Sequence, residues 1–306
     1  MNRTLATEFI LLGFSKDFRV NIFLFLLFLV IYIVTVIGNV LIISLIITAP
    51  NLHTPMYFFL FVLSLVDLCM STSVVPRLLA DLLSTLRLIS LGACTIQFYS
   101  LLLMSGTESF LLVLMAYDRY IAICRPLHYR ILMRWSICYR LTALLWIISF
   151  LVVILPCLLM PIDLCYPNDI NHYMCETLAV MQLACDKIYF NELSMFLSSF
   201  ISLFLPFLFV IVSYACIISS VLRIHSTERS KAFSTCTSHI TVVVLFYGTA
   251  IIMYFGPSFQ YSTNQGKYFS LSYIICPLLN PLIYSLNNKE VKDTSRKLIV
   301  RVFIPQ

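Results

Sequence analysis

Residues 23–48 read FLFLLFLVIYIVTVIGNVLIISLIIT, an apolar run without a single charged side chain. A helix needs roughly 20 mainly apolar residues to cross the roughly 30 Å hydrocarbon layer of a bilayer at a rise of about 1.5 Å per residue. Because lipid offers no partner for unpaired backbone groups, such a run has to be helical inside a membrane. This stretch therefore predicts one membrane-spanning helix.

Six further apolar stretches with few charges follow along the chain. They are residues 56–80, 95–123, 141–160, 191–222, 236–257 and 268–286. None shows the alternation that the strands of a membrane β-barrel require. The sequence predicts an all-α membrane protein, a seven-transmembrane helix bundle that forms one domain over residues 1–306. Prolines inside the spans, at Pro76, Pro156, Pro206 and Pro281, predict kinks that neighbouring helices stabilise.

The composition supports a membrane as the solvent. The 306 residues are 60% hydrophobic and 11% charged, whereas a soluble domain carries about 25% charged residues. Residues 1–22 mix charges with apolar residues and contain no cleavable signal peptide, so the first helix is expected to direct insertion. The formal charge of +6 comes from basic residues dispersed over short loops. We therefore expect membrane lipid, and no nucleic acid, as a partner.

Basic residues predict the orientation. They gather on one side of the predicted membrane and comprise Arg125, Arg130, Arg134, Arg140, Arg223, Arg229, Lys231, Lys289, Lys292, Arg296, Lys297 and Arg301. The opposite segment, 161–190, is mainly acidic. Lys16 and Arg19 before the first helix disagree locally, but the larger bias predicts a plasma-membrane protein with an extracellular N-terminus and a cytoplasmic C-terminus. Asn2-Arg3-Thr4 is then an outer glycosylation sequon, and residues 288–303 predict a basic amphipathic helix on the inner leaflet.

Four polar residues fall at comparable depth within the predicted spans. They are Asn39, Asp67, Glu108 and Asn280. Charges in a bilayer are costly, so a cluster facing the bundle interior is expected. Two nearby carboxylates do not both stay ionised cheaply, so Asp67 and Glu108 either share a proton or hold a cation such as sodium. A purely structural hydrogen-bonded network is the alternative. No other cofactor is expected.

Two other function classes were weighed from the residues. An enzyme would need a nucleophile with its base or a set of metal ligands, and the five histidines form no HExxH-like spacing. A secondary transporter also places carboxylates at mid-membrane, but such proteins tend to contain internal repeats, and the two halves of this chain show none. Accumulation of substrate in an uptake assay would favour the transporter.

Several motifs point to a family. Residues 115–129 read MAYDRYIAICRPLHY, and the chain also contains PMYFFL at 55–60, SLVD at 64–67, KAFSTC at 231–236 and PLLNPLIY at 277–284. This set, spread in order over essentially the whole chain, resembles odorant receptors of the rhodopsin-like G-protein-coupled receptor family. The resemblance implies a receptor that binds a small volatile odorant in its extracellular half and activates a heterotrimeric G protein of the stimulatory or olfactory type, raising cAMP.

The resemblance also assigns roles at the cytoplasmic end. Residues implied in G-protein coupling and activation are Asp118, Arg119, Tyr120, Tyr214, His239 and Tyr284. Arg119 would be released on activation to meet the G protein, with Tyr214 and Tyr284 moving inward to support it. Where many rhodopsin-like receptors have a restraining acid on helix six, this chain reads Glu228-Arg229-Ser230-Lys231, which puts that lock in doubt. Asn287 replaces an arginine that is common in the family.

Four cysteines would face the oxidising outer compartment, where disulfides persist. They are Cys94, Cys165, Cys175 and Cys185, and four cysteines allow three pairings that sequence cannot separate. The resemblance implies Cys94 with Cys175 and Cys165 with Cys185.

A ligand cavity is expected among helices three, five, six and seven, as is usual between the helices of bundles. The candidate lining residues are Leu101, Leu102, Ser105, Gly106, Ser198, Ser202, Tyr247, Ala250, Ile251 and Tyr254. The aspartate with which amine receptors hold their ligands has no counterpart at Leu101. This surface favours a small, largely apolar molecule with one hydrogen-bonding group, although each position also suits ordinary helix packing.

Overall fold

The computed structural model describes residues 7–222, 226–256, 264–287 and 291–294, without the side chains of 226–235, 264–265 and 285–287. Its helices, with short 3-10 or π turns marked η, are α1 (Phe18–Thr48), η1 (Pro50–Leu52), α2 (Pro55–Leu83), α3 (Leu91–Cys124), η2 (Pro126–His128), α4 (Tyr129–Leu132), α5 (Trp135–Ser149), η3 (Phe150–Ile154), α6 (Leu155–Leu159), α7 (Thr177–Met181), α8 (Tyr189–Ser199), η4 (Phe200–Phe204), α9 (Leu205–Val221), α10 (Ser226–Phe255), α11 (Asn264–Phe269) and α12 (Ser272–Asn287). Three short strands are β1 (Glu8–Leu11), β2 (Leu88–Ser90) and β3 (Asp169–Ile170).

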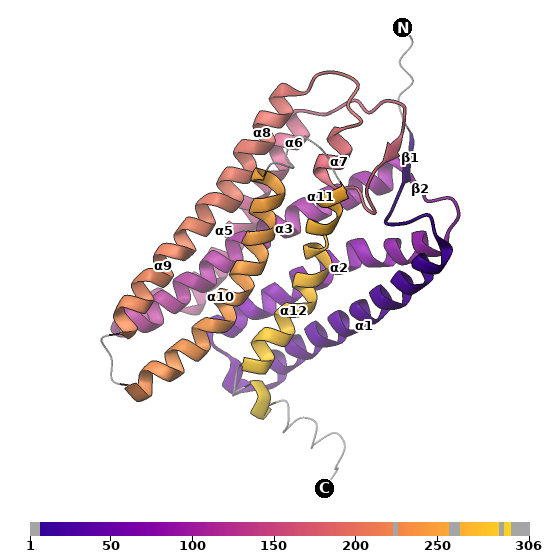
Figure 1. The fold of residues 1–306 in the computed structure, drawn as a ribbon. Coiled ribbons are helices and arrows are strands. Elements are labelled where there is room, and N and C mark those ends of the chain that lie inside the picture. The colour runs from indigo at the N-terminus through magenta and orange to yellow at the C-terminus, as the bar shows by residue number, and fades with distance from the viewer. Residues whose placement is uncertain (1–6, 223–225, 257–263, 288–290, 295–306) are drawn as a thin grey trace.

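Within these residues, six helical runs are long and apolar enough to cross a membrane. The fourth run joins α5, η3 and α6, and the fifth joins α8, η4 and α9. The predicted run 268–286 is wrong in its bounds, because α11 ends at Phe269 and α12 begins at Ser272. The Ser270 hydroxyl donates to the carbonyl of Lys267, a local bond that competes with helix propagation. The 16-residue α12 packs against α1, α2 and α10 (Figure 1).

The outer surface of the bundle is apolar, most clearly on α1. Phe18, Phe23 and Ile37 are each more than 60% exposed, and the surface of a soluble protein would not carry a continuous face of such residues. A hydrocarbon solvent removes that cost. The helices therefore bury their polar residues inward and present apolar ones outward, as membrane-spanning helices do.

Two of the proline kinks are built from π turns. Pro156 and Pro206 lack an N–H, so each leaves the carbonyl four residues earlier without its helical donor. The freed carbonyl of Val152 accepts a hydrogen bond from the Ser198 hydroxyl at 2.8 Å. The freed carbonyl of Ser202 accepts one from the Ser109 hydroxyl. A neighbouring helix thus supplies each missing donor, as expected for prolines in a bundle.

A small β-sheet covers one end of the bundle, where the sequence predicts no strand. β1 pairs antiparallel with β2 and parallel with β3, and α7 lies beneath the sheet. We call the layer formed by residues 8–13, 88–90 and 164–185, which includes β1, β2, β3 and α7, the roof. The roof has an apolar core of its own, in which Phe9 and Cys175 are fully buried and Leu11, Ile170 and Ala179 nearly so.

The predicted tail helix lies largely outside the described residues. Residues 291–294 are helical; the Val291 side chain is buried, and the Asn51 amide donates to the Thr294 hydroxyl at 3.1 Å. This turn packs against the end of the bundle opposite the roof. The sequon at Asn2 also lies outside the described residues.

Candidate functional site

A cavity of about 250 Å³ lies under the roof. Its walls come from the outer half of α3, from η3 and α6, and from α8 and η4, while α7 lies over it. In Figure 1 these elements gather at one end of the bundle. None of the described residues that line the cavity is an Asp, Glu, Lys, Arg or His. Its polar atoms are hydroxyls and one amide, so the cavity suits an uncharged molecule.

Six of the ten predicted lining residues do line the cavity: Leu102, Ser105, Gly106, Ser198, Ser202 and Tyr254. The hydroxyl of Ser198 is already engaged by Val152, which makes this serine a structural residue at the cavity wall. Ala250 lies instead at a separate small void of about 20 Å³ beside Glu108.

Three predicted lining residues lie elsewhere in the bundle. Leu101 is buried among apolar residues of α1 and α2, because one step along α3 turns it about 100° away from Leu102. Tyr247 is fully buried in the main core, where its hydroxyl donates to the Ser109 carbonyl at 2.7 Å. Ile251 packs against the same core. At these positions the sequence alone does not distinguish a residue that lines a cavity from one that packs between helices.

The fourth span and the roof also line the cavity, although the sequence predicts lining residues only on the third, fifth and sixth spans. Val153, Pro156, Cys157 and Met160 line one wall, and Thr177, Val180 and Met181 of α7 line the top. The sequence predicts a kink at Pro156. In the structure, the π turn that precedes Pro156 widens the helix at this wall. Nothing in the sequence of the outer loop signals that α7 folds over the cavity.

A buried hydrogen-bonded chain connects the roof to the cavity wall. Glu176 caps α7 by accepting from the backbone N–H groups of Leu178 and Ala179, at 2.9 and 3.3 Å. Its other carboxylate oxygen accepts from the Tyr254 hydroxyl at 3.2 Å, and that hydroxyl lies 3.2 Å from the Tyr273 hydroxyl. Both tyrosines line the cavity. Burial raises the pKa of Glu176 to about 7.

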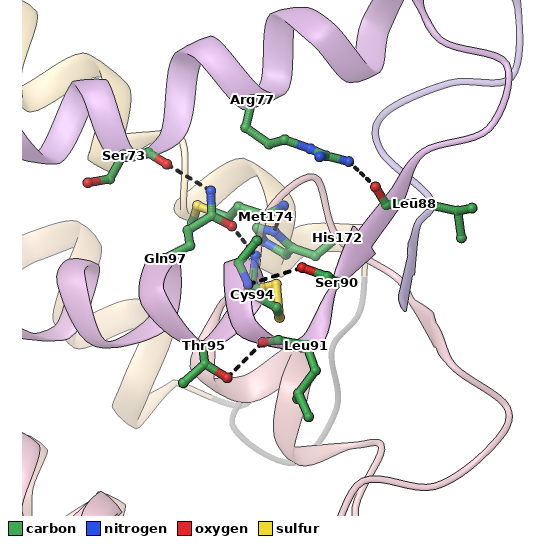
Figure 2. Close-up of a disulfide and its surroundings, with 12 residues drawn as sticks. Ser73, Arg77, Leu88, Ser90, Leu91, Cys94, Thr95, Gln97, His172 and Met174 are labelled. Carbon is green, nitrogen blue, oxygen red and sulfur yellow. Dashed lines mark hydrogen bonds between the residues drawn. A yellow bond between two sulfur atoms is a disulfide. The ribbon is translucent and has the colours of Figure 1, made fainter. Parts of the chain in front are cut away.

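The roof is fastened to α3. A disulfide joins Cys94 to Cys175, and a second one joins Cys165 to Cys185, so the pairing is the one that the resemblance implied. Beside the first disulfide, the Gln97 amide donates to the Ser73 carbonyl and accepts from the Cys175 N–H, both at 2.8 Å (Figure 2). These contacts hold the loop before α7 against α2 and α3.

The roof also contacts α11. The ring of His172 lies 2.9 Å from the Ser270 hydroxyl, and the Lys267 ammonium donates to the Gly13 carbonyl at 2.9 Å. Burial lowers the pKa of His172 to about 3, so this ring is neutral at physiological pH. The N-terminal segment, the long outer loop and α11 are thus joined above the bundle.

Deep in the bundle, three of the four predicted polar residues meet. The Asn280 amide donates to both carboxylate oxygens of Asp67, at 3.1 and 3.0 Å, and to Glu108 at 3.4 Å. Asn39 bonds instead to the carbonyls of Thr35 and Pro277. Asp67 and Glu108 are fully buried, and the second carboxylate oxygen of Glu108 has no hydrogen-bond partner among the described residues.

The donor chemistry at this cluster fits a monovalent hard cation or a proton. All free ligand atoms are oxygens, which suits a hard cation. In the described part of the chain no three His, Cys, Asp or Glu residues come together. The two carboxylates are therefore too few for a transition-metal site.

At the end opposite the roof, the predicted coupling residues form two pairs. The Arg119 guanidinium lies 3.3 Å from the carboxylate of buried Asp118, which also accepts from the Tyr129 hydroxyl at 2.9 Å. The Tyr214 hydroxyl lies 2.6 Å from His239 Nδ1, and the two rings stack.

The remaining two coupling residues differ in burial. Tyr284 is buried, and its hydroxyl has no partner among the described residues. Tyr120 packs half-buried against the core. The side chains of 228–231 lie outside the described residues, so the prediction about the helix-six lock stays a prediction.

An uncharged cavity at one end of a lipid-facing bundle and the Asp118–Arg119 ion pair at the other fit a multi-pass helical membrane receptor. The sequence model of the olfactory receptor family matches residues 28–303 of this chain. The chain belongs to the olfactory receptor family. This membership implies a seven-helix bundle in the plasma membrane, with α12 as the seventh span.

Individual relatives agree over the full length. The chain is 45% identical to olfactory receptor 2B6 of Mus musculus, covering 99% of this chain and 98% of the relative. It is 47% identical to olfactory receptor 2F1 of Homo sapiens, covering 97% and 95% respectively. The olfactory receptor-like protein OLF3 of Canis lupus familiaris is 46% identical over 97% of this chain. The protein is accordingly a receptor and not an enzyme.

Proposed function

We propose that this receptor binds a small, uncharged and largely apolar odorant in the cavity under the roof and then activates a stimulatory or olfactory G protein, which raises cAMP. The observation that carries the proposal is the cavity itself. Its volume of about 250 Å³ is below the roughly 300–1,000 Å³ of pockets for drug-sized ligands. Its hydroxyls, such as those of Ser105 and Tyr273, suit a ligand with one hydrogen-bonding group.

The opposite end of the bundle supports the signalling step. A guanidinium stays charged and offers several donors, so Arg119 could leave Asp118 for backbone carbonyls of a G protein. The Tyr214 hydroxyl and His239 Nδ1, 2.6 Å apart, lie at the same end of the bundle. The receptor has a state in which the Arg119 end is open and one in which it is closed. An odorant whose affinity for the cavity is higher in the open state shifts the equilibrium toward that state.

The test is a screen of volatile compounds against the expressed chain with a cAMP readout, followed by Arg119→Ala. We expect Arg119→Ala to abolish the odorant-dependent rise in cAMP at unchanged surface expression, because it removes the fixed positive charge that is proposed to meet the G protein. Arg19→Ala, which removes the same side chain at the roof end, is the control and should respond like the wild type. Retained signalling in Arg119→Ala would contradict the proposal.

We also propose that one positive charge, a sodium ion or a shared proton, lies between the carboxylates of Asp67 and Glu108 and reduces their mutual repulsion. The unpaired oxygen of Glu108 supports this, since a buried acceptor without a partner is costly. Asp67 and Glu108 would hold the ion, whose bound charge would stabilise the closed bundle.

The measurement is the thermal stability of the purified receptor with sodium or choline as the cation, and across pH. Sodium should raise the melting temperature of the wild type, as any ligand of the folded state does, and Asp67→Asn should remove that rise. A shared proton would appear as a pH dependence that Asp67→Asn removes. If Asp67→Asn changes neither the sodium effect nor the pH profile, the cluster is purely structural.

The roof end is proposed to be extracellular and the Arg119 end cytoplasmic, with membrane lipid around the bundle. The basic residues support this orientation, because lysines and arginines in short loops are retained on the cytoplasmic side. The disulfides on the roof also suit an oxidising compartment.

A further inference from the structure

The cavity reaches the surface of the protein at its side. Most of its lining is buried or half-buried, but Leu91 and Thr95 on α3 and Met160 and Pro161 after α6 are exposed. Leu91 and Met160 are 42% and 40% exposed. The Asn191 amide of α8 donates to the Met160 carbonyl at 2.7 Å, which fixes one edge of this opening. We call the opening between Leu91, Thr95, Met160 and Pro161 the side mouth.

The neighbours of the side mouth show what solvent it faces. Ile96, next to Thr95, is 73% exposed, and Leu159, next to Met160, is 70% exposed. On α8, Phe190 precedes Asn191 and is 78% exposed, and Leu193, two residues after Asn191, is 54% exposed, with the exposed Glu192 between them. Large apolar side chains with such exposure are stable where lipid covers them. The side mouth therefore opens into the outer part of the bilayer.

Among the residues that the structure describes, packed apolar side chains separate the top of the cavity from water. Val180 and Met181 of α7 cover the top of the cavity, and the other face of α7 packs into the roof core, where Phe9 is fully buried. The Cys94–Cys175 disulfide ties this layer to α3. A molecule arriving from the aqueous side would have to separate packed apolar surfaces, whereas one arriving from lipid meets side chains that already face lipid.

We propose that the ligand reaches the cavity from the outer leaflet of the membrane, through the side mouth, after partitioning into lipid. This inference rests on the proposed odorant-binding function of the cavity, whose apolar ligands concentrate in lipid. Access from the bilayer selects molecules first by their partition into the membrane and then by their fit to the cavity.

The test uses a thiol that already lines the cavity. Cys157 is a free cysteine at the cavity wall, and Cys69 is an exposed free cysteine on α2 that does not line it. The full chain in lipid nanodiscs is treated with an uncharged, lipid-partitioning N-alkylmaleimide or with a charged, water-soluble methanethiosulfonate. Modification of each cysteine is followed over time by peptide mass spectrometry, with Cys157→Ser identifying the peptide.

Three variants separate the two routes. Thr95→Trp fills the side mouth, Ile96→Trp adds the same ring to the adjacent lipid-facing position, and Phe9→Ala loosens the roof core. We expect the maleimide to modify Cys157 about tenfold more slowly in Thr95→Trp, a modest rise of the barrier. Ile96→Trp and Phe9→Ala should keep the wild-type rate, and Cys69 should react equally in all four proteins.

Other results would overturn the inference. An unchanged rate in Thr95→Trp would exclude the side mouth as the route. Modification of Cys157 by the charged reagent, faster in Phe9→Ala, would show access from water through the roof. Because labelling needs no G protein and no odorant, failure of this inference is distinct from failure of the proposed receptor function.

Discussion

Glu176 is the residue on which roof and cavity meet, because its carboxylate caps α7 and accepts from Tyr254 of the cavity wall. Its side chain is only 4% exposed. An ionised carboxylate at such a site loses hydration that three hydrogen bonds only partly replace. The protonation state of this one residue is therefore linked to the stability of the whole roof.

The pKa of Glu176, raised from 4.5 to about 7, predicts a pH dependence of stability. Between these values the folded protein keeps a proton that the unfolded chain has lost. The stabilisation is thus fully present below pH 4.5 and is lost as the pH rises to about 7, by on the order of 3 kcal/mol. Glu176→Gln should lack this fall, as measured by thermal unfolding in nanodiscs between pH 4.5 and 8.

Two comparisons make that prediction specific. The pKa of His172 is lowered from 6.5 to about 3, so its protonation destabilises the folded protein as the pH falls, which is the opposite sense. Because His172 is present in both proteins, its effect cancels in the difference between their profiles. Glu192→Gln, at an exposed glutamate of α8, should keep the wild-type profile. Identical profiles for Glu176→Gln and the wild type would show that Glu176 does not titrate in this range.

At the scale of elements, several contacts between helices of this bundle form where a residue lacks a backbone N–H or a side chain. Pro156 and Pro206 each lack a donor, and serines of adjacent helices replace it. Gly38 lacks a side chain, and a Cβ there would lie 3.1 Å from the Pro281 ring of α12. Small residues at such contacts let membrane helices pack closely.

Gly38→Leu should therefore push α1 away from α12. We expect a loss of about 1–3 kcal/mol, the usual cost of overpacking, seen as a lower melting temperature. Gly92→Leu is the matched control, because a Cβ at Gly92 meets no atom within 4 Å, and it should melt like the wild type. Equal effects of the two substitutions would mean that helix propensity rather than the α1–α12 contact decides.

At the scale of the whole molecule, the orientation in the membrane determines which end meets odorant and which meets the G protein. Epitope tags on the two termini of the expressed chain should be accessible in intact cells only at the N-terminus. Asn2→Gln should remove an N-linked glycan, detected as a mobility shift that glycosidase treatment of the wild type reproduces. Both tags on the same side of the membrane would be incompatible with seven spans and with the receptor mechanism.

Most of the membrane-spanning helices could be predicted from the sequence, because the requirement that lipid places on a helix applies to one continuous stretch of residues. Lipid requires a minimum length of apolar helix at each crossing, so runs such as 23–48 and 56–80 predicted α1 and α2 within a few residues. The meeting of Asp67 with Asn280 was also expected, since polar residues in a bilayer are expected to face one another.

Only the tertiary structure decided the shape of the cavity. Whether Leu101 or Leu102 faces the ligand depends on the rotation of α3 against α2, and the wall at Cys157 depends on a π turn opposite α8. The roof joins β1 to segments some 80 and 160 residues away along the chain. The local sequence of each segment does not indicate which distant segment it will contact. Such contacts are therefore fixed by packing across the bundle and not by any single stretch.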